Sequence, residues 1–322
     1  MKRIVVTGGA GFIGSNIALA LAAEGHDVVV VDWLGHGDKW HNLRGCRCAD
    51  IVPPERLDDV LASGEISAVI HMGAISSTTE RDVDLILATN FQVSSKLWTW
   101  CSNRHVPFVY ASSAATYGDG THGFHDTEDP AYLARLEPLN PYGWSKHLFD
   151  RWAVEQVRRS ERTPPVWAGL KYFNVYGPRE AHKGPQRSVI AQIYDQVRAG
   201  QPARLFKSHH PDYEDGRQLR DFVWVGDAVA ATLWFLEGTR PSGLYNVGSG
   251  TARSFADAAR AVFTALDLTP EIEYVPTPEA VRRHYQYFTK AEMTKLRGAG
   301  FDHAPTTLED GVSRYVEFLK AG

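Results

Sequence analysis

Short apolar runs alternate with longer mixed stretches along the first half of the chain. The runs at residues 4–6, 28–31 and 108–111 are wholly apolar, as strands buried on both faces of a parallel sheet are. The stretches between them are long enough for helices, and the alternation continues to about residue 173, which indicates right-handed βαβ units. We therefore predict an α/β fold whose doubly wound parallel sheet carries helices on both faces.

From about residue 174 the pattern changes, and a second, smaller domain is expected. A strand at residues 222–225 and a helix at 227–236 are predicted to return to the first domain. Other helices are predicted at residues 188–199, 254–266 and 308–319, and the last two are expected to cap the smaller domain. The predicted domains are a nucleotide-binding domain over residues 1–173 plus about 222–250, and a mixed α/β substrate-binding domain over about 174–221 plus 251–322.

A glycine-rich turn, TGGAGFIG at residues 7–14, directly follows the first apolar run. Gly8, Gly11 and Gly14 recur every third residue where the chain is expected to pass from a strand into a helix. Glycine lets the backbone turn sharply and lie against a pyrophosphate, which binds at the helix N-terminus. The next strand ends at Asp32, whose carboxylate suits the adenosine ribose. These features predict a Rossmann-type dinucleotide site.

A tyrosine–lysine pair lies in the sequence PYGWSK. Asn140 suits a helix N-cap and Pro141 a first helical position, so Tyr142 and Lys146 are predicted to share one helix face. Tyrosine, with an ordinary pKa of ~10, is a poor base at neutrality, and we expect Lys146 and a positively charged nicotinamide to lower that pKa. Ser113, just after the run at 108–111, suits a hydrogen bond to the same substrate oxygen. The set indicates hydride chemistry on an alcohol or ketone.

These motifs resemble the extended short-chain dehydrogenase/reductase family over nearly the whole chain. HMGAISSTTE at residues 71–80 is similar to the family's loop beneath the cofactor, and YFNVYGPR at 172–179 and LRDFVWVGD at 219–227 are similar to later blocks. The family includes nucleotide-sugar epimerases, dehydratases, reductases and decarboxylases. The resemblance implies cofactor contacts from Gly8, Gly11, Phe12, Ile13, Gly14, Asp32, Trp33, Lys39, Met72, Gly73, Ala74, Ile75, Ser76, Asn90, Lys146 and Val175.

The segment VYGPREAHKG, at residues 175–184, resembles one branch of this family more specifically, the heptose epimerases that act on ADP-heptoses. The resemblance implies that Lys183 is a second acid or base beside Tyr142, with Ser113 and Lys146 completing the catalytic set. The implied reaction is oxidation of the sugar at carbon six with tightly bound NADP, followed by reduction from the opposite face. The substrate contacts that the resemblance implies are Asn174, Phe206, Arg220 and Tyr285.

The residues around Asp32 bear on the choice of cofactor. Lys39 suits the 2′-phosphate of NADP, because a cation pairs with that dianion. Asp32 instead favours NAD, since a carboxylate repels the phosphate, and Pro54 stands where the resemblance leads us to expect a second basic residue. We expect NADP, with NAD as the alternative.

Other functions on the same fold remain open. Dehydratases of the family carry an Asp-Glu pair after the serine, and here Ala114 and Ala115 cannot donate the proton that expels water. An epimerase acting at carbon four of a UDP-hexose needs the same Ser, Tyr and Lys and stays an alternative. A non-catalytic, cofactor-sensing regulator is the other alternative, although such a protein would not need the intact set of site residues.

Composition and charge limit the kinds of binding partner and the cellular compartment that we expect for the protein. The 322 residues carry a net charge of −4 with no basic block, so the sequence lacks the cluster of positive charge that is typical of nucleic-acid binding. No signal segment precedes the first strand and no apolar run approaches ~18 residues, so we expect a cytoplasmic protein without membrane contact. The resemblance implies a homo-oligomer, which in this branch is a pentamer.

The cysteines and histidines predict no metal site. The odd count of three cysteines, Cys46, Cys48 and Cys101, indicates reduced thiols rather than a disulfide framework. The first two lack the spacing of zinc ligands, and no second pair completes a site. His209 and His210 lie beside acidic residues, but a solvated loop is favoured there over a metal site.

Overall fold

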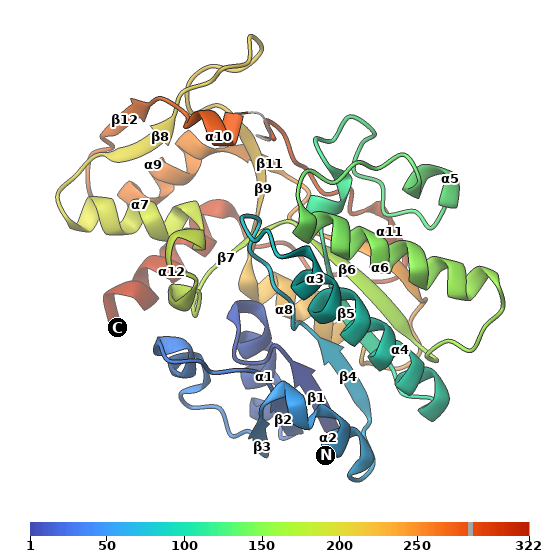
Figure 1. The fold of residues 1–322 in the computed structure, drawn as a ribbon. Helices are drawn as coiled ribbons and strands as arrows, with labels where there is room; N and C mark the ends of the chain where they lie inside the picture. Colours follow the sequence, from blue (N-terminus) through green and yellow to red (C-terminus); the bar gives the residue numbers. More distant parts are fainter. Residues whose placement is uncertain (283–285, 322) are drawn as a thin grey trace.

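A seven-stranded sheet forms the centre of the protein in a computed structural model that describes residues 1–282 and 286–321 (Figure 1). Over these residues the strand order is β10-β6-β5-β4-β1-β2-β3, and every neighbouring pair is parallel. This order confirms the predicted doubly wound α/β fold. The strands are β1 (Arg3–Thr7), β2 (Asp27–Val31), β3 (Asp50–Val52), β4 (Ala68–His71), β5 (Phe108–Ser113), β6 (Trp167–Tyr172) and β10 (Gly243–Val247).

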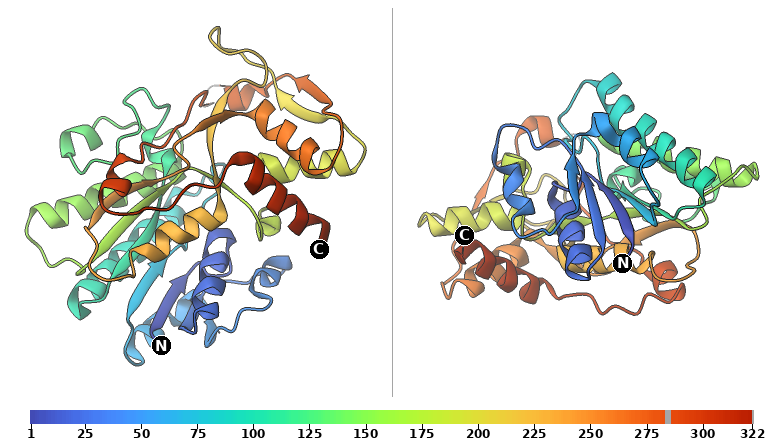
Figure 2. Two further views of the ribbon diagram at one scale, coloured as in Figure 1. Left: turned by 180° about the vertical axis from the view of Figure 1, so that it is seen from behind. Right: turned by 90° about the horizontal axis from the view of Figure 1, so that it is seen from below.

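Helices cover both faces of this sheet (Figure 2). On one face α1 packs against α8, and on the other α4 and α6 lie over β5. Successive residues of β1 and β2 enter two different buried clusters, so these strands are apolar throughout. Within the described residues, no helix combines the length and the apolar character needed to cross a bilayer. The helices here are α1 (Phe12–Ala23), α2 (Leu57–Ala62), α3 (Val83–Ile86), α4 (Val93–Arg104), α5 (Pro130–Leu133), α6 (Pro141–Arg158), α8 (Val225–Trp234) and α11 (Thr294–Gly298).

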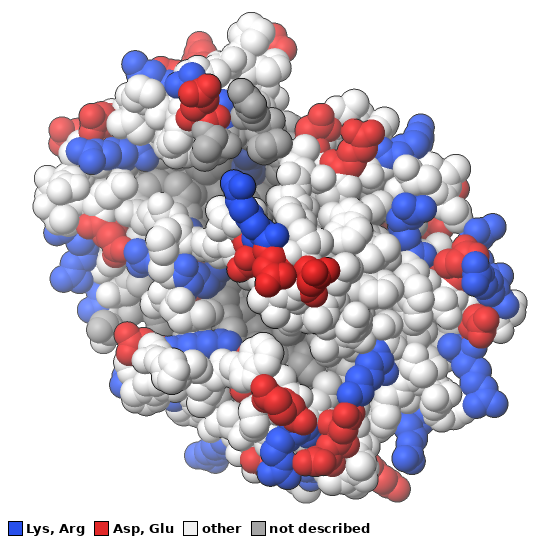
Figure 3. All heavy atoms as spheres, viewed as in Figure 1, with Lys and Arg blue, Asp and Glu red and all other residues white. Residues whose placement is uncertain are grey.

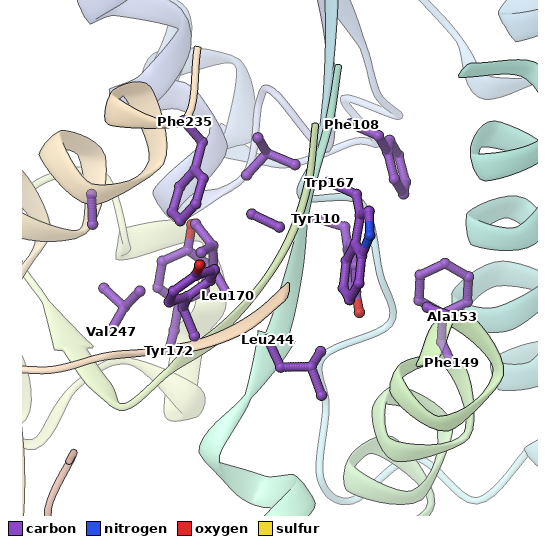
Figure 4. Close-up of a cluster of buried hydrophobic side chains, with 14 of the residues drawn as sticks. Phe108, Tyr110, Phe149, Ala153, Trp167, Leu170, Tyr172, Phe235, Leu244 and Val247 are labelled. Atoms are coloured by element: carbon purple, nitrogen blue, oxygen red, sulfur yellow. The ribbon is translucent and has the colours of Figure 1, made fainter. Parts of the chain in front are cut away.

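Aromatic packing around β5 and β6 fixes the position of α6 (Figure 4). Tyr110 and Trp167 point to one side of the strands, toward Phe149 of α6, whereas Leu170 points to the other side with Phe235. The rings of Tyr110 and Phe149 meet edge to face with centroids 4.8 Å apart. Because α6 carries the tyrosine–lysine pair, this packing sets its position relative to the end of β5.

A second hydrophobic core organises the smaller part of the chain. There β9 lies between β7 and β11, and β8 pairs with β12. The later helices α9 and α12 pack against each other over this core, and α7 packs against α9. The elements are β7 (Asn174–Tyr176), β8 (Ala203–Phe206), β9 (Leu219–Trp224), β11 (Ala252–Ser254), β12 (Ile272–Val275), α7 (Val189–Arg198), α9 (Phe255–Ala265), α10 (Glu279–Arg282) and α12 (Leu308–Ala321).

The strand predicted at residues 222–225 does not join the main sheet. This strand is β9, which lies in the three-stranded sheet with Phe222 in the second core and Val223 in the first. A strand between two cores is apolar on both faces, so its sequence resembles that of a strand inside a parallel sheet. The main sheet gains β10 beside β6 instead, while α8 does return to pack against α1.

Cys46 and Cys48 form a disulfide, so the prediction of reduced thiols is wrong for this pair. The two residues lie in the irregular segment between the 3₁₀ turn at Asp38–Leu43 and β3, where the chain brings the two sulfur atoms together. The two Cα atoms are 5.3 Å apart, a separation that a disulfide readily spans. Cys101 is free, and burial raises the pKa of its thiol.

Candidate active site

The glycine turn between β1 and α1 is tightly packed. Gly8 has a φ of +66°, and a Cβ atom there would lie 2.5 Å from the backbone nitrogen of Gly73. A Cβ atom at Gly14 would lie 2.1 Å from the carbonyl oxygen of Gly8. α1 then begins at Phe12 with no acidic residue in its first turn. The positive end of the helix dipole is therefore uncompensated by side chains, as a phosphate-binding turn requires.

Asp32, at the end of β2, is held by the glycine turn and by Lys39. Its Oδ2 accepts a 2.9 Å hydrogen bond from the backbone N–H of Ala10, and its Oδ1 lies 2.6 Å from the Lys39 ammonium. Lys39 also donates to the carbonyl of Trp33 at 2.8 Å. The indole of Trp33 is half-exposed and donates to Glu55. Lys39 therefore offsets the negative charge of the carboxylate that lies beside the turn.

The loop after β4, residues 72–76, is fixed by Asn90. The side chain of Asn90 accepts from the backbone N–H of Ile75 at 2.8 Å and donates back to its carbonyl at 3.0 Å. It also donates to the hydroxyl of Ser145 in α6 at 3.0 Å. Asn90 is fully buried. Its contacts within the chain are therefore those of a residue that shapes the loop and ties it to α6.

Ser113 and Tyr142 meet at the junction of β5 and α6, as the sequence predicted. Their side chains are joined by a hydrogen bond, and α6 begins with Asn140 as its N-cap. Burial raises the pKa of Tyr142, and the bond to Ser113 opposes this only in part. The expectation that Lys146 lowers this pKa is therefore wrong for the chain's own residues. The loss of water around the phenol raises the pKa of Tyr142, and the negative charge of Asp150 adds to this shift.

Lys146 lies one helical turn after Tyr142 and is buried. Burial lowers its pKa to about 8, against an opposing effect of the Asp150 charge. His71 lies close enough for burial and the Lys146 charge to lower its pKa to about 3. The imidazole is therefore neutral, and it bonds the hydroxyls of Thr7 at 2.6 Å and Ser94 at 2.9 Å. His71 thus connects the surroundings of Lys146 to the start of the glycine turn.

Lys183 reaches the cofactor side of the site from a separate segment. Its ammonium lies 5.4 Å from the centroid of the Phe12 ring, at the start of α1. Burial lowers its pKa, and the charge of Glu180 opposes that shift. A lysine with a lowered pKa can accept and return a proton near neutrality.

The residues expected at the substrate are spread over the smaller part of the chain. Asn174 is exposed at the start of β7 and accepts a bond from Thr289 at 3.3 Å. Phe206, at the end of β8, is partly exposed. Arg220 is buried, donates to the carbonyls of Leu219 and Gln286, and its guanidinium lies 5.4 Å from the ring centroid of Phe255. Tyr285 lies outside the described residues.

The remaining sequence-predicted positions line the same region. Met72 accepts a long contact from the Tyr172 hydroxyl at 3.8 Å, and Val175 is half-buried in β7 against the first core. Ser76 is exposed. The face drawn in Figure 3 is hollowed between the two parts of the molecule, and acidic and basic side chains are mixed over it. No group of residues that could hold a metal ion occurs in the described parts of the chain. The backbone N–H of His209 donates a hydrogen bond to the hydroxyl of Tyr287.

Sequence reasoning missed several residues that shape the site. His71 and the buried ion pair of Asp150 with Lys171 lie beneath it, and Asn42 and His182 bond each other beside it. A lysine in the middle of the apolar strand WAGLKY is a signal that a buried acid pairs with it. The contact of Asn42 with His182 has no such signal, because it joins residues 140 positions apart.

Comparison with known proteins identifies the family. Residues 4–248 match the NAD dependent epimerase/dehydratase family. The chain is 48% identical over 323 residues to the ADP-L-glycero-D-manno-heptose-6-epimerase of Nitratidesulfovibrio vulgaris, with 98% of each covered. The structure of the Helicobacter pylori enzyme of the same name matches with a TM-score of 0.81 and 29% identity, over 100% of this chain and 97% of that one.

A second solved structure, the UDP-glucose 4-epimerase of Thermus thermophilus in complex with NAD, matches with a TM-score of 0.79 and 28% identity, over 99% of both chains. The family match spans well over half of the chain, and the relative at 48% identity spans nearly all of it. The protein therefore belongs to the NAD dependent epimerase/dehydratase family and is an epimerase, an enzyme of the isomerase class.

Proposed function

We propose that the protein interconverts ADP-D-glycero-D-manno-heptose and ADP-L-glycero-D-manno-heptose at carbon six, using tightly bound NADP. The observation that carries this proposal is that two partly buried proton-handling groups on separate segments lie near the glycine turn. Lys183 contacts Phe12 of that turn. Tyr142 lies one helical turn before Lys146, whose charge acts on His71, the partner of Thr7. The relative at 48% identity carries the name of this activity.

The residues present fit a dinucleotide. The glycine turn leaves no room for a Cβ atom at Gly8 or Gly14, and the first turn of α1 carries no acid that would repel a pyrophosphate. The residues that would hold the cofactor are those of the glycine turn, Asp32, Lys39, the loop at 72–76 and Lys146. Bound there, a nicotinamide supplies reversible acceptance of a hydride from a secondary alcohol.

The chain's own groups then handle the protons. Oxidation of the alcohol at carbon six removes the hydroxyl proton together with a hydride, and reduction from the opposite face returns the hydride to carbon and a proton to oxygen. The hydroxyl points to a different side in each isomer, so one proton-handling group on each side serves best. Tyr142 holds this proton at its phenol oxygen for one isomer, and Ser113 orients the same oxygen by its hydrogen bond. Lys183 holds it at Nζ for the other isomer, which its lowered pKa favours.

NADP is proposed over NAD because of Lys39. Its ammonium is 2.6 Å from Asp32 Oδ1, so the carboxylate that would repel a 2′-phosphate is already paired with a cation. A lysine at this position also adds a charge-assisted donor to that phosphate. Asn174, Phe206 and Arg220, with Tyr285, are proposed to bind the ADP-sugar, Arg220 by its planar guanidinium at the diphosphate.

We also propose a cytoplasmic homo-oligomer. A surface groove between α4 and α6 is lined by Phe91, Trp100 and Trp152 together with polar residues. Aromatic side chains in a groove on a helical face are typical of a protein interface. Light scattering of the purified protein tests this, because a monomeric mass at micromolar concentration would contradict it.

The proposed activity is tested by incubating the purified protein with ADP-D-glycero-D-manno-heptose and following carbon six by NMR. The expected result is an equilibrium mixture of both isomers without added nucleotide, because the cofactor is already bound. UDP-glucose and UDP-galactose serve as the second pair of substrates. Interconversion of these UDP-sugars, with the heptose left unchanged, would contradict the proposal and assign the carbon-four reaction.

A further inference from the structure

The loop that carries Lys183, residues 181–187, is closed at its base by a buried carboxylate. Glu180 is fully buried, and its side chain accepts hydrogen bonds from the backbone N–H and the hydroxyl of Ser188, both at 2.5 Å. These bonds join the residues at the two ends of the loop. Within it a 3₁₀ turn kinks at Gly184, whose φ of +54° disfavours other residues. The loop is therefore anchored where it leaves the smaller part of the chain.

A partly shielded hydrogen bond crosses from this loop to the dinucleotide-binding part. Nδ2 of Asn42, in the 3₁₀ turn after β2, donates to Nδ1 of His182 at 2.9 Å and to the carbonyl of Ala10 at 2.9 Å. An amide nitrogen only donates, so the imidazole must present an unprotonated Nδ1. Asn42 is 4% exposed. The bond of Asn42 to Ala10 is buried and its bond to His182 is partly buried, so the bridge connects the loop to the backbone of the glycine turn with limited access of water.

A second hydrogen bond crosses on the other side of Lys183. Nε2 of Gln186 donates to the hydroxyl of Ser77, in the loop after β4, at 2.7 Å. This pair is exposed, so the bond contributes less than the shielded one. The two bridges reach the loops that follow β2 and β4, and these strands flank β1. The loop thus spans the end of the strand that leads into the glycine turn.

We propose that His182 and Gln186 are positioning residues, which clasp the loop 181–187 onto Asn42 and Ser77 and thereby both place Lys183 and retain the bound cofactor. The placement of Lys183 rests on its proposed role; the retention of cofactor does not. Lysine has a long flexible side chain, and bridges at positions 182 and 186 fix the backbone on both sides of it. The loop must break both bridges before it can swing away from the glycine turn, so cofactor release requires their loss.

The test measures the rate at which pyridine nucleotide leaves the purified, cofactor-bound protein, by fluorescence after mixing with an excess of competing nucleotide and without sugar. Asn42→Ala and His182→Ala should each raise this rate about tenfold, the effect of losing a shielded hydrogen bond. Because His182→Ala removes only a bond that Asn42→Ala also removes, the double variant should exceed the Asn42→Ala variant by no more than about twofold. Gln186→Ala should give a smaller increase of about two- to threefold, as expected of an exposed bond.

Ala181→Ser is the matched control, an exposed position of the same loop, and should leave the rate unchanged. The second bridge gives a second pair of variants, Gln186→Ala and Ser77→Ala, which remove an exposed hydrogen bond and are not expected to unfold the protein. This pair keeps the proposal testable if the Asn42→Ala variant unfolds. In that pair too, the double variant should match the single ones. Rates within twofold of the wild type for both His182→Ala and Gln186→Ala, or multiplicative effects within each pair, would overturn the proposal. A protein inactive on ADP-heptose would refute the proposed function but leave these rates to test the clasp.

Discussion

Asp150 and Lys171 form an ion pair at 2.5 Å in which neither side chain is exposed to solvent. The carboxylate also accepts from the hydroxyls of Tyr110 at 3.0 Å and Ser112 at 2.7 Å, and Lys171 donates to Thr116 at 2.8 Å. The pair joins α6 to β6, and the bonds of Asp150 to Tyr110 and Ser112 join α6 to β5, whose last residue meets Tyr142 at the site. Every partner that a buried carboxylate needs is supplied by these neighbours.

Removing one charge of this pair should destabilise the protein strongly. Lys171→Met leaves Asp150 charged in a site without water, which should cost about 3–5 kcal/mol of unfolding free energy. Lys171→Met combined with Asp150→Asn should recover much of this loss, because no buried charge then remains unpaired. Urea unfolding of the three proteins measures the difference. A single variant as stable as the wild type would show that the pair is not buried in solution.

Lys183→Met should reduce epimerisation while leaving cofactor binding intact. General acid or base catalysis contributes typically about 10²- to 10⁴-fold, so kcat should fall by about that factor. The matched control is Lys207→Met, which removes an exposed lysine from another loop of the smaller part. Rates of isomer interconversion and the bound nucleotide per chain are the measurements. A Lys183→Met enzyme with the activity of the Lys207→Met enzyme would remove this residue from the mechanism.

Lys39→Ala should weaken NADP binding more than NAD binding. The lost charge-assisted hydrogen bond should raise the Kd of NADP about 10- to 100-fold, and Asp32, freed of its cation, would add repulsion of the 2′-phosphate. The Kd of NAD should change by less than about threefold, because NAD has no such phosphate. Lys96→Ala, which removes an exposed lysine paired with Asp58, is the control. Calorimetric titration of both nucleotides checks this, and an equal loss for the two would show that Lys39 does not select the phosphate.

Stability should fall as pH is lowered below about 6.5, in part because of His71. Burial, with a smaller effect of the Lys146 charge, lowers its pKa from 6.5 to about 3. Below pH 6.5 the unfolded chain therefore binds a proton at His71 that the folded protein does not bind. The contribution of His71 to the unfolding free energy is complete above pH 6.5 and is lost as pH falls toward 3. Between pH 6.5 and 4.5 the loss from one such group is about 2–3 kcal/mol.

His71→Asn should flatten this pH dependence without abolishing it. His147, whose pKa burial lowers to about 4, acts in the same direction and remains in the variant. Urea unfolding at pH 7 and pH 4.5 gives the slope for each protein. If both proteins lose the same unfolding free energy between these two values, His71 is not held neutral in the folded state.

The parts of the site that follow from local sequence were predicted well. The glycine turn has its own steric requirement at Gly8, and Tyr142 and Lys146 share a helix face by their spacing alone. The contact of Ser113 with Tyr142 could be predicted because the end of a strand and the start of a helix were both recognisable in the sequence. The chain's own residues raise the pKa of Tyr142 instead of lowering it, because the sequence shows charged neighbours but not the degree of burial.

Features that depend on distant contacts were not predictable from the pattern. The apolar sequence of β9 fits a strand inside the main sheet as well as one between two cores, and only the fold distinguishes them. The disulfide of Cys46 with Cys48 depends on the backbone conformation of a loop, which the sequence does not set. The bond between Asn42 and His182 likewise requires that two separate loops meet beside the glycine turn.

The central claim, that the sugar gives up a hydrogen and takes the same one back, is tested most directly by isotope incorporation. The purified protein is incubated with ADP-heptose in deuterated water, and carbon six is examined by NMR at equilibrium. We predict that both isomers form and that carbon six keeps its original hydrogen. Deuterium at carbon six would contradict the account, because it would show exchange of that hydrogen with solvent by deprotonation at carbon.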